Sequence, residues 1–205
     1  QKDASNYVVS ACWEPAPIAK GLEVNNLNCI IFLNPLNELL DYENLSNIHN
    51  FRELVNLYKI YLKKYIKNFI KSLNKIIWEE DPLLSFFIDN CDEKQIDISE
   101  GGAFYNNYGV TSVSLGNTVN SLYNIKKFVF DEGKYSLTEL NNYRKNNFKE
   151  NEDLCLKLKN QQIRFGTDND EIISLSNEIT GYVNELFKIN TNSLGGKFKF
   201  GLSAP

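Results

Sequence analysis

The longest regular pattern in the sequence is an apolar stripe between Asn50 and Trp78. Its hydrophobic residues recur at steps of three and four, which predicts an amphipathic helix with one buried face. Lysines recur every four residues on the opposite face: Lys59, Lys63, Lys67, Lys71 and Lys75. A basic face can lie on a membrane or bind an acidic partner. The width of the apolar stripe and the acidic residues that follow it favour a packed helix with a solvated outer face.

Shorter helices are predicted by apolar positions at helical spacing elsewhere. Their approximate bounds are 35–40, 83–88, 117–130, 137–148, 151–158 and 170–187. Pro35 suits a first helical turn, where the missing N–H would have no partner. Ser136 and Glu139 form a capping box. Thr167 or Asp168 is expected to cap the last helix.

Strands are expected where β-prone residues alternate or follow glycine. The run that begins at Tyr7 leads into Cys12, and Lys197 to Phe200 alternates between polar and apolar residues. Gly101 and Gly102 precede an aromatic, β-prone run, which predicts a strand whose backbone approaches a neighbour closely. Lys20 to Asn28 is polar and is expected to be a loop. Cys29 to Leu33 fits either a buried strand or the entry to a helix.

Composition narrows the class of protein. The 205 residues are 42% hydrophobic, enough for a core, and the net charge of −4 gives no case for nucleic acid or an anionic membrane. No run of 18 apolar residues occurs, so no membrane span is expected. The absence of Met indicates that Gln1 is not a natural start. The glycines match neither GxGxxG nor GxxxxGK, so nucleotide binding has little support.

The cysteines give no pattern for a metal or for disulfides. They stand at 12, 29, 91 and 155 without a CxxC pair, and the chain has a single histidine, His49. Zinc and iron–sulfur sites are therefore not expected, and no metal ligand is assigned. No signal peptide is recognisable, so a reducing cytoplasm is the expected location.

The stretch Asn6-Tyr-Val-Val-Ser-Ala-Cys12-Trp-Glu14-Pro15 holds the candidate chemistry. If the backbone stays extended through Pro15, Cys12 and Glu14 point to the same side. A nucleophilic thiolate needs a lowered pKa, and a neighbouring carboxylate acts in the opposite direction. A cysteine hydrolase is therefore disfavoured. Two interpretations stay open: a small buried residue, the usual role of free cysteine, or a protonated thiol whose S–H bond is homolysed.

The order of motifs resembles the glycyl radical enzyme superfamily, which includes pyruvate formate-lyase and its dehydratase, decarboxylase and C–N lyase relatives. The motifs are Ala11-Cys12-Trp13-Glu14-Pro15, Asp97-Ile-Ser-Glu-Gly-Gly-Ala-Phe-Tyr105-Asn106, Ser121-Leu-Tyr-Asn-Ile-Lys126-Lys127-Phe-Val-Phe, Tyr135-Ser-Leu-Thr-Glu-Leu140 and Phe165-Gly166-Thr-Asp168-Asn-Asp170. Each motif alone is modest. Together they cover nearly the full chain in the family's order.

The resemblance implies the fold class: α/β and helix-rich, part of a ten-stranded α/β barrel whose lumen receives a cysteine-bearing loop. Residues 1–205 would be part of one catalytic barrel domain, without the N-terminal half and the C-terminal loop that carries the radical glycine. In this comparison Tyr7 to Ala11 would deliver Cys12, and Gly101 to Asn106 would be another barrel strand. The helix from Asn50 would belong to the outer shell.

The resemblance also implies a mechanism and its components. A glycyl radical, installed by a radical SAM activating enzyme and stored outside this chain, would take hydrogen from Cys12, and the resulting thiyl radical would attack a small-molecule substrate. Glu14 would deprotonate a substrate hydroxyl. Asn25 and Asn26 fall where the family often places pocket residues. The expected setting is anaerobic and cytoplasmic, with the full-length protein a homodimer.

One residue separates the branches of the family. Pyruvate formate-lyases carry adjacent cysteines at this turn, whereas this chain has Ala11-Cys12. The Cys-x-Glu pattern therefore favours an eliminating enzyme, a dehydratase or C–N lyase acting on a small hydroxylated substrate. Two alternatives stay open: a formate C-acetyltransferase-like acyltransferase, and a non-catalytic helical interaction domain with a buried cysteine.

Overall fold

A computed structural model describes residues 3–10, 14–21 and 24–202. The chain forms two compact units. The first unit consists of Gln1–Ile30, Ile66–Val113 and Asn184–Pro205, and the second of Ile31–Tyr65 and Ser114–Val183. Each unit is described by itself below.

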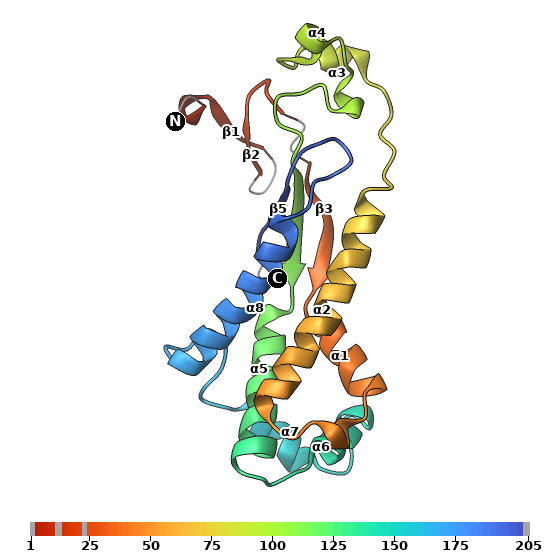
Figure 1. The fold of residues 1–205 in the computed structure, drawn as a ribbon. Helices are drawn as coiled ribbons and strands as arrows, with labels where there is room; N and C mark the ends of the chain where they lie inside the picture. The colour runs from red at the N-terminus through yellow and green to blue at the C-terminus, as the bar shows by residue number, and fades with distance from the viewer. Residues whose placement is uncertain (1–2, 11–13, 22–23, 203–205) are drawn as a thin grey trace. The chain divides into compact units, whose positions relative to one another are not determined.

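The strands of the described residues belong to the first unit and form two sheets. Strands β1 (Tyr7–Ser10) and β2 (Glu14–Pro17) pair antiparallel as a hairpin. A second sheet has the order β3 (Val24–Ile31), β4 (Tyr108–Val113) and β5 (Phe198–Phe200), with β4 and β5 parallel. The arrows of β3 and β4 also point the same way (Figure 1). Parallel strands joined through helices are the pattern of an α/β barrel segment.

Two prolines in β2 shape the hairpin. The register pairs Tyr7 with Pro17 and Val9 with Pro15. The backbone N–H of Ile18 donates to the carbonyl of Asn6 at 2.9 Å, which identifies that pair as hydrogen-bonded. Because hydrogen-bonded and non-bonded pairs alternate, both prolines fall at non-bonded pairs, where the N–H would point away from β1. The prolines therefore cost the hairpin no hydrogen bond and leave the outer edge of β2 without two donors.

The core of the first unit is aromatic. Tyr108 is buried on β4, and its ring meets those of Phe198 and Trp78 edge to face. The ring of Phe187 lies against Phe198 and stacks on Phe200, with centroids 5.8 and 5.9 Å apart. The indole N–H of Trp78 donates to the Tyr108 hydroxyl at 2.7 Å. These contacts attach the segment after helix α2 to the three-stranded sheet.

Short helices complete the first unit. They are α3 (Pro82–Phe86), α4 (Cys91–Lys94) and the 3₁₀ turns at Ala4–Asn6 and Ile98–Glu100. Asp81 caps α3, because its side chain accepts from the N–H of Leu84 at 2.9 Å. A small cluster of Cys91, Ile98 and Ala103 is buried beneath these turns. The segment from Asn90 to Ser99 therefore holds ordered turns at Cys91–Lys94 and at Ile98–Glu100.

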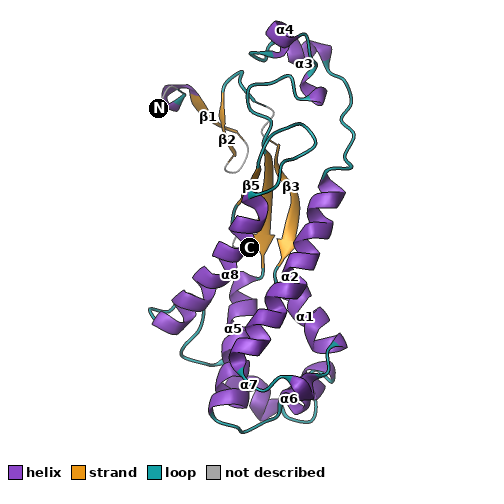
Figure 2. Ribbon diagram, viewed as in Figure 1, coloured by secondary structure: helices purple, strands orange, loops and turns teal. Residues whose placement is uncertain are grey.

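The second unit is helical. It contains α1 (Leu33–Tyr42), the 3₁₀ turn Leu45–Asn47, the first part of α2 (Phe51–Leu73), α5 (Leu115–Ile125), a π-helical turn (Lys126–Asp131), α6 (Leu137–Lys145), α7 (Glu152–Lys159) and most of α8 (Asp170–Lys188). Figure 2 shows α1 following β3 and α5 following β4 directly. Their apolar faces supply the core, with Leu36, Leu54, Tyr58 and Leu122 fully or almost fully buried.

Most predicted helices are confirmed, with changed ends. The long helix stops at Leu73 instead of Trp78, because Trp78 is committed to Tyr108. The cap of α8 is Asn169 and not Thr167 or Asp168, since its side-chain oxygen accepts from the N–H groups of Glu171 and Ile172. Spacing located these helices, whereas tertiary contacts determined their ends.

The lysine row on α2 is only partly the predicted solvated face. Lys63, Lys67, Lys71 and Lys75 are exposed. Lys59 is not: its ammonium lies 2.5 Å from the carboxylate of Glu178 and 5.4 Å from the centre of the Tyr182 ring. Lys59 therefore joins α2 to α8 within the second unit, a role that its place in the row did not indicate.

Removal of the α6 cap should weaken that helix locally. The Ser136 hydroxyl oxygen accepts from the N–H of Glu139, whose carboxylate accepts in return from the N–H of Ser136 at 2.8 Å. Ser136→Ala is expected to cost about 1 kcal/mol, measured as faster amide hydrogen exchange over residues 137–145. Thr138→Ala, at an exposed position of the same helix, is the control. Equal exchange in both variants would contradict the cap's contribution.

Candidate functional site

The hairpin β1–β2 flanks the predicted catalytic turn. Ser10 pairs with Glu14 across the hairpin, so the chain reverses direction between them. Glu14 and Pro15 lie in β2, whereas the extended backbone considered for the residues before them stays untested. Residues 11–13, including Cys12, lie outside the described residues, as does the side chain of Glu14. Their roles stay predictions.

Asn25 and Asn26 lie in strand β3 and not in the predicted loop. Asparagine has a low intrinsic preference for strands, but pairing of β3 with β4 decides the backbone here. The side chains of both residues lie outside the described part. Their proposed contact with substrate is untested and stays a prediction. Cys29, in the same strand, is a half-buried free thiol, and the strand alternative for the start of the Cys29 to Leu33 run is the observed one.

The hairpin is tied to the rest of the first unit at its open end. Asp3, just before β1, receives a hydrogen bond from the Lys20 ammonium and another from the Tyr105 hydroxyl, the latter at 2.7 Å. The N–H of Tyr105 donates to the Lys20 carbonyl at 2.8 Å, and Gly21 forms a β-bridge with Tyr105. Both arms of the hairpin are thus held by one tyrosine.

Asp3, Lys20 and Tyr105 shift one another's pKa values. The hydrogen bonds from Lys20 and Tyr105 lower the pKa of Asp3, and the Asp3 carboxylate raises the pKa values of Lys20 and Tyr105. For a carboxylate with a lowered pKa, stability is present above the ordinary aspartate range and is lost as the pH falls through the folded-state value. The ion pair is therefore formed at neutral pH.

The segment from Gly101 to Asn106 is a loop and not the predicted barrel strand; the strand is β4, which begins at Tyr108. The side-chain amide of Asn106 donates to the carbonyls of Gly101 and Ala103, both at 3.0 Å. Asn192 in turn donates to the Asn106 carbonyl at 2.6 Å. The backbone carbonyls of this segment accept hydrogen bonds from asparagine side chains instead of from a neighbouring strand. This explains why its β-prone residues do not form a strand.

Asp97, in the same motif, has a structural role. Its carboxylate accepts from the Ser85 hydroxyl at 2.6 Å and from the N–H groups of Ser99 and Asp81. These hydrogen bonds hold the pKa of Asp97 well below its usual range. Three of its partners belong to one cluster of turns, so Asp97 is committed to the fold and is not available as a base.

Close backbone contact explains two of the glycines around this loop. A Cβ on Gly102 would stand 2.0 Å from the carbonyl oxygen of Ile96, and one on Gly196 would stand 1.8 Å from that of Asn106. The close approach predicted for the paired glycines is confirmed at Gly102. Gly196 was not singled out by the sequence, because its neighbour lies far away along the chain.

A pair of alanine substitutions should have opposite effects. Gly196→Ala forces the loop away from Asn106 and is expected to destabilise the first unit by about 2 kcal/mol or more. Gly181→Ala, in helix α8 with open space around it, is expected to stabilise by about 0.5–1 kcal/mol. Chemical denaturation of the full-length protein checks both signs. An unchanged free energy of unfolding in Gly196→Ala would show that the loop moves away from Asn106 at little cost.

A cavity of about 470 Å³ lies in the second unit, among α1, α5, α6 and α7. Leucines line its base, and its polar lining includes Asn141 and Arg144. The Arg144 guanidinium donates to Asn37 and Asn141 and pairs with Asp41, so it is already satisfied.

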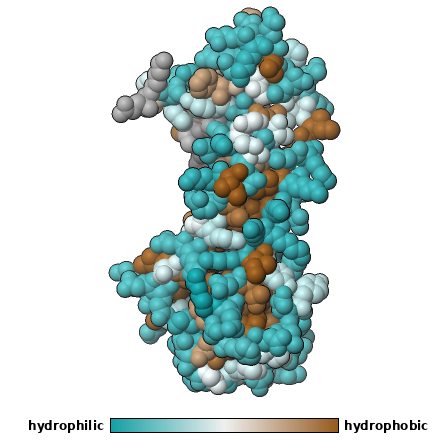
Figure 3. All heavy atoms as spheres, in the orientation of Figure 1, coloured by the Kyte–Doolittle hydropathy of each residue, from teal (hydrophilic) through white to brown (hydrophobic). Residues whose placement is uncertain are grey.

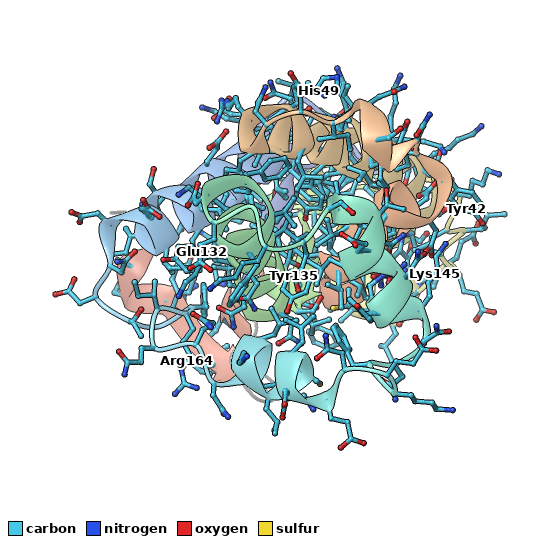
Figure 4. The ribbon with its side chains drawn as sticks, turned by 90° about the horizontal axis from the view of Figure 1, so that it is seen from below. Tyr42, His49, Glu132, Tyr135, Lys145 and Arg164 are labelled. Atoms are coloured by element: carbon cyan, nitrogen blue, oxygen red, sulfur yellow. The ribbon has the colours of Figure 1, made fainter. Side chains whose placement is uncertain are left out.

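The histidine does not build a second catalytic centre. His49 is exposed, and Figure 4 shows it at the periphery of the molecule. Its backbone N–H donates to the Glu53 carboxylate at 2.7 Å, at the start of α2. Within the described ranges no group of three His, Cys, Asp or Glu residues is placed to hold a metal. None of the described helices is long and apolar enough to cross a membrane.

The hairpin exposes apolar surface. Val9 is 67% exposed, and Tyr7, Val8 and Ile18 are also exposed. Other exposed apolar residues occur elsewhere, and Figure 3 shows brown groups among hydrophilic ones on one face. A two-stranded hairpin with apolar residues exposed on both faces is marginal in water on its own. Such surface is typical of a segment that inserts into surrounding protein.

Sequence and structure together decide the family. A family model described as pyruvate formate lyase-like matches residues 1–204. The chain belongs to this family. Among solved structures, the glycerol-bound form of the B12-independent glycerol dehydratase from Clostridium butyricum superposes with a TM-score of 0.90 and 28% identity over 98% of this chain. A glycyl radical enzyme from Archaeoglobus fulgidus has a TM-score of 0.83 at 24% identity over 97% of this chain, which shows the fold alone.

The pyruvate formate lyase-like chain also resembles a curated dehydratase. The trans-4-hydroxy-L-proline dehydratase of Clostridioides difficile is 34% identical over 106 residues, which are 51% of this chain and 13% of that protein. The chain covers 28% of the glycerol dehydratase and 27% of the Archaeoglobus enzyme. It therefore spans about a quarter of the solved relatives. The resemblance and the α/β barrel fold class inferred from the motifs are confirmed at this level.

Sequence reasoning missed the residues at the open end of the hairpin. Asp3 and Lys20 have no motif around them, and 17 residues separate them. Tyr105 stood in a recognised motif without a role. The register of the hairpin was the missing information, because it brings Asp3 and Lys20 together. The spacing of residues in the sequence does not give that register.

Proposed function

We propose that this chain is the cysteine-bearing part of a glycyl radical enzyme that eliminates water or an amine from a small hydroxylated substrate. The observation that carries the proposal is the Cys12-x-Glu14 pair in the sequence, in the stretch between the strands β1 and β2 of an exposed apolar hairpin. The family match and the dehydratases among its relatives support it. Ala11 in place of a second cysteine argues against acyl transfer.

The radical stored on a glycine outside this chain supplies one oxidising equivalent when the enzyme is activated, by removing the hydrogen atom of the Cys12 thiol. The Cys12 thiyl radical then takes a hydrogen atom from the substrate carbon that bears the hydroxyl group. Glu14 accepts the proton of that hydroxyl. The adjacent C–O or C–N bond breaks, and the leaving group departs with the proton that Glu14 had accepted, which restores the carboxylate. Cys12 returns its hydrogen atom to the product radical, so that a vicinal diol gives a carbonyl compound and water.

The hairpin suits this chemistry physically. A thiol beside a carboxylate stays protonated, since the negative charge raises the pKa of the thiol, and hydrogen-atom transfer needs the protonated form. The exposed apolar side chains of Tyr7, Val8 and Val9 would be covered by the barrel wall of the full-length protein. A covered site excludes water from the radical intermediates. Asn25 and Asn26 are proposed as pocket residues of the same lumen.

The remaining components follow from the same proposal. A radical SAM activase would install the glycyl radical in the full-length protein, which we propose to be a cytoplasmic homodimer. Small molecules, and not nucleic acids or membranes, are the proposed partners. These components concern the whole protein.

The test uses the full-length protein with its activating enzyme under anaerobic conditions. Electron paramagnetic resonance should show a glycyl radical doublet after activation. The activated enzyme is then given glycerol, propane-1,2-diol or trans-4-hydroxy-L-proline, and dehydration products are measured by mass spectrometry. Formate from pyruvate and coenzyme A would instead establish the acyltransferase. Absence of any radical would favour the non-catalytic interaction domain and overturn the proposal.

A further inference from the structure

The base of the hairpin is the structural feature that the proposed chemistry leaves unused. The Asp3 carboxylate accepts from the Lys20 ammonium and from the Tyr105 hydroxyl. Asp3 stands four residues before the start of β1 at Tyr7, and Lys20 stands three residues after the end of β2 at Pro17. Tyr105 belongs to neither strand. One residue from elsewhere in the unit therefore meets both ends of the hairpin, Asp3 through its hydroxyl and Lys20 through its backbone N–H.

Few other contacts hold the hairpin in the described structure. Asn6 and Ile18 bond to each other, which closes the hairpin without attaching it to the unit. The N–H of Asp89 donates to the Ala19 carbonyl at 2.6 Å. Beyond the base, β1 and β2 pair with each other and with no third strand of the described part. Within the described residues, the hairpin is therefore attached to the unit mainly at its base.

The group is also partly shielded from water. The side chains of Lys20 and Asp3 are only 28% and 20% exposed. An ion pair with restricted exposure and a second donor has a more defined geometry than a free surface pair. Tyr105 is fixed in turn by its backbone, through the bond to Lys20 and the bridge to Gly21. The backbone and the hydroxyl of Tyr105 thus contact the two sides of the hairpin base at the same place.

From this geometry we propose that Asp3, Lys20 and Tyr105 form a clamp that aims the hairpin and thereby sets the reach of Cys12 towards its hydrogen-atom partners. The clamp residues are positioning residues, because they act through the hairpin and touch neither substrate nor radical. The inference rests on the proposed function, because only that function requires Cys12 to reach a hydrogen-atom partner. Hydrogen-atom transfer requires reacting atoms within contact distance, and a misplacement of about 1 Å can cost about 100-fold in rate.

The test removes one hydroxyl from the full-length enzyme. Tyr105→Phe keeps the ring and the backbone bonds but loses the hydrogen bond to Asp3. We expect kcat to fall by about 10- to 100-fold with little change in KM, because the substrate pocket is intact. The yield of glycyl radical and the melting temperature should stay close to wild type. In D₂O, deuterium should exchange into the radical glycine through Cys12. The exchange is measured as the loss of the proton splitting in the electron paramagnetic resonance spectrum, and its rate should fall in parallel with kcat.

Tyr61→Phe is the matched control. The Tyr61 hydroxyl also donates to a carboxylate, that of Glu43 at 2.8 Å, but in the second unit. Asp3→Asn, which removes the ion pair with Lys20, should repeat the effect of Tyr105→Phe. Wild-type kcat and exchange rate in Tyr105→Phe, or an equal loss in Tyr61→Phe, would overturn the clamp. A wild-type enzyme without radical or dehydration would overturn the proposed function instead, so the two failures are distinguishable.

Discussion

Cys12→Ser is expected to abolish turnover of the full-length enzyme while the glycyl radical persists. An O–H bond is much stronger than an S–H bond, so serine cannot pass its hydrogen atom to the radical at a useful rate. The expected loss in kcat is on the order of 10⁴-fold or more, the scale found when a side chain that acts covalently is removed. The measurement combines electron paramagnetic resonance of the activated variant with a product assay on the same sample.

Cys155→Ser is the control for this experiment. Cys155 is a half-buried free thiol on α7, in the second unit, and has no role in the proposed chemistry. It should retain wild-type turnover and radical yield. Turnover that survives in Cys12→Ser would refute the assignment of Cys12. A Cys12→Ser variant that lacks the radical altogether would be compared with Cys12→Ala, to separate loss of chemistry from failed activation.

Glu14→Gln is expected to lower kcat by about 10²- to 10⁴-fold, the usual contribution of a general base. Glutamine keeps the shape and polarity of the side chain but cannot accept the proton of the substrate hydroxyl. Hydrogen abstraction by Cys12 does not need that proton transfer. Deuterium exchange between the activated enzyme and a substrate labelled at the reacting carbon should therefore continue while product formation falls.

The control for the base is Glu79→Gln, at an exposed position of the first unit. It should behave as wild type in both assays. Normal turnover by Glu14→Gln would remove the argument for elimination, because the Cys-x-Glu pattern would then have no chemical role. A loss of labelled-hydrogen exchange together with turnover would instead place Glu14 in substrate binding.

The helices were predictable because each carries its own signal. The period of α2 and the capping box of α6 are local, and tertiary contacts moved only their ends. The strands were less predictable. The 101–106 segment has β-prone aromatic residues, but its backbone carbonyls accept hydrogen bonds from the side chains of Asn106 and Asn192. In contrast, β3 contains asparagines, which disfavour strands, and still pairs with β4. Strand formation depends on a partner far away in the sequence, which local preference does not report.

The candidate site was predictable only as far as residue chemistry goes. Cys12 and Glu14 stood out as a thiol paired with a carboxylate without a histidine, but their catalytic roles came from the family resemblance and stay predictions. Their geometry was not, because the hairpin register depends on where the chain turns. The residues that hold the hairpin were invisible for the same reason: an aspartate and a lysine acquire meaning only when β1 and β2 bring them together.

The prolines of β2 have a consequence for folding. During synthesis, before the strands that would surround it are complete, the hairpin is a short, apolar β-ribbon of the kind that recruits other chains. Because Pro15 and Pro17 remove the outward N–H groups of β2, a foreign strand finds no regular row of donors on that edge. The sequence of β2 thus makes its outer edge a poor partner for the strands of other chains.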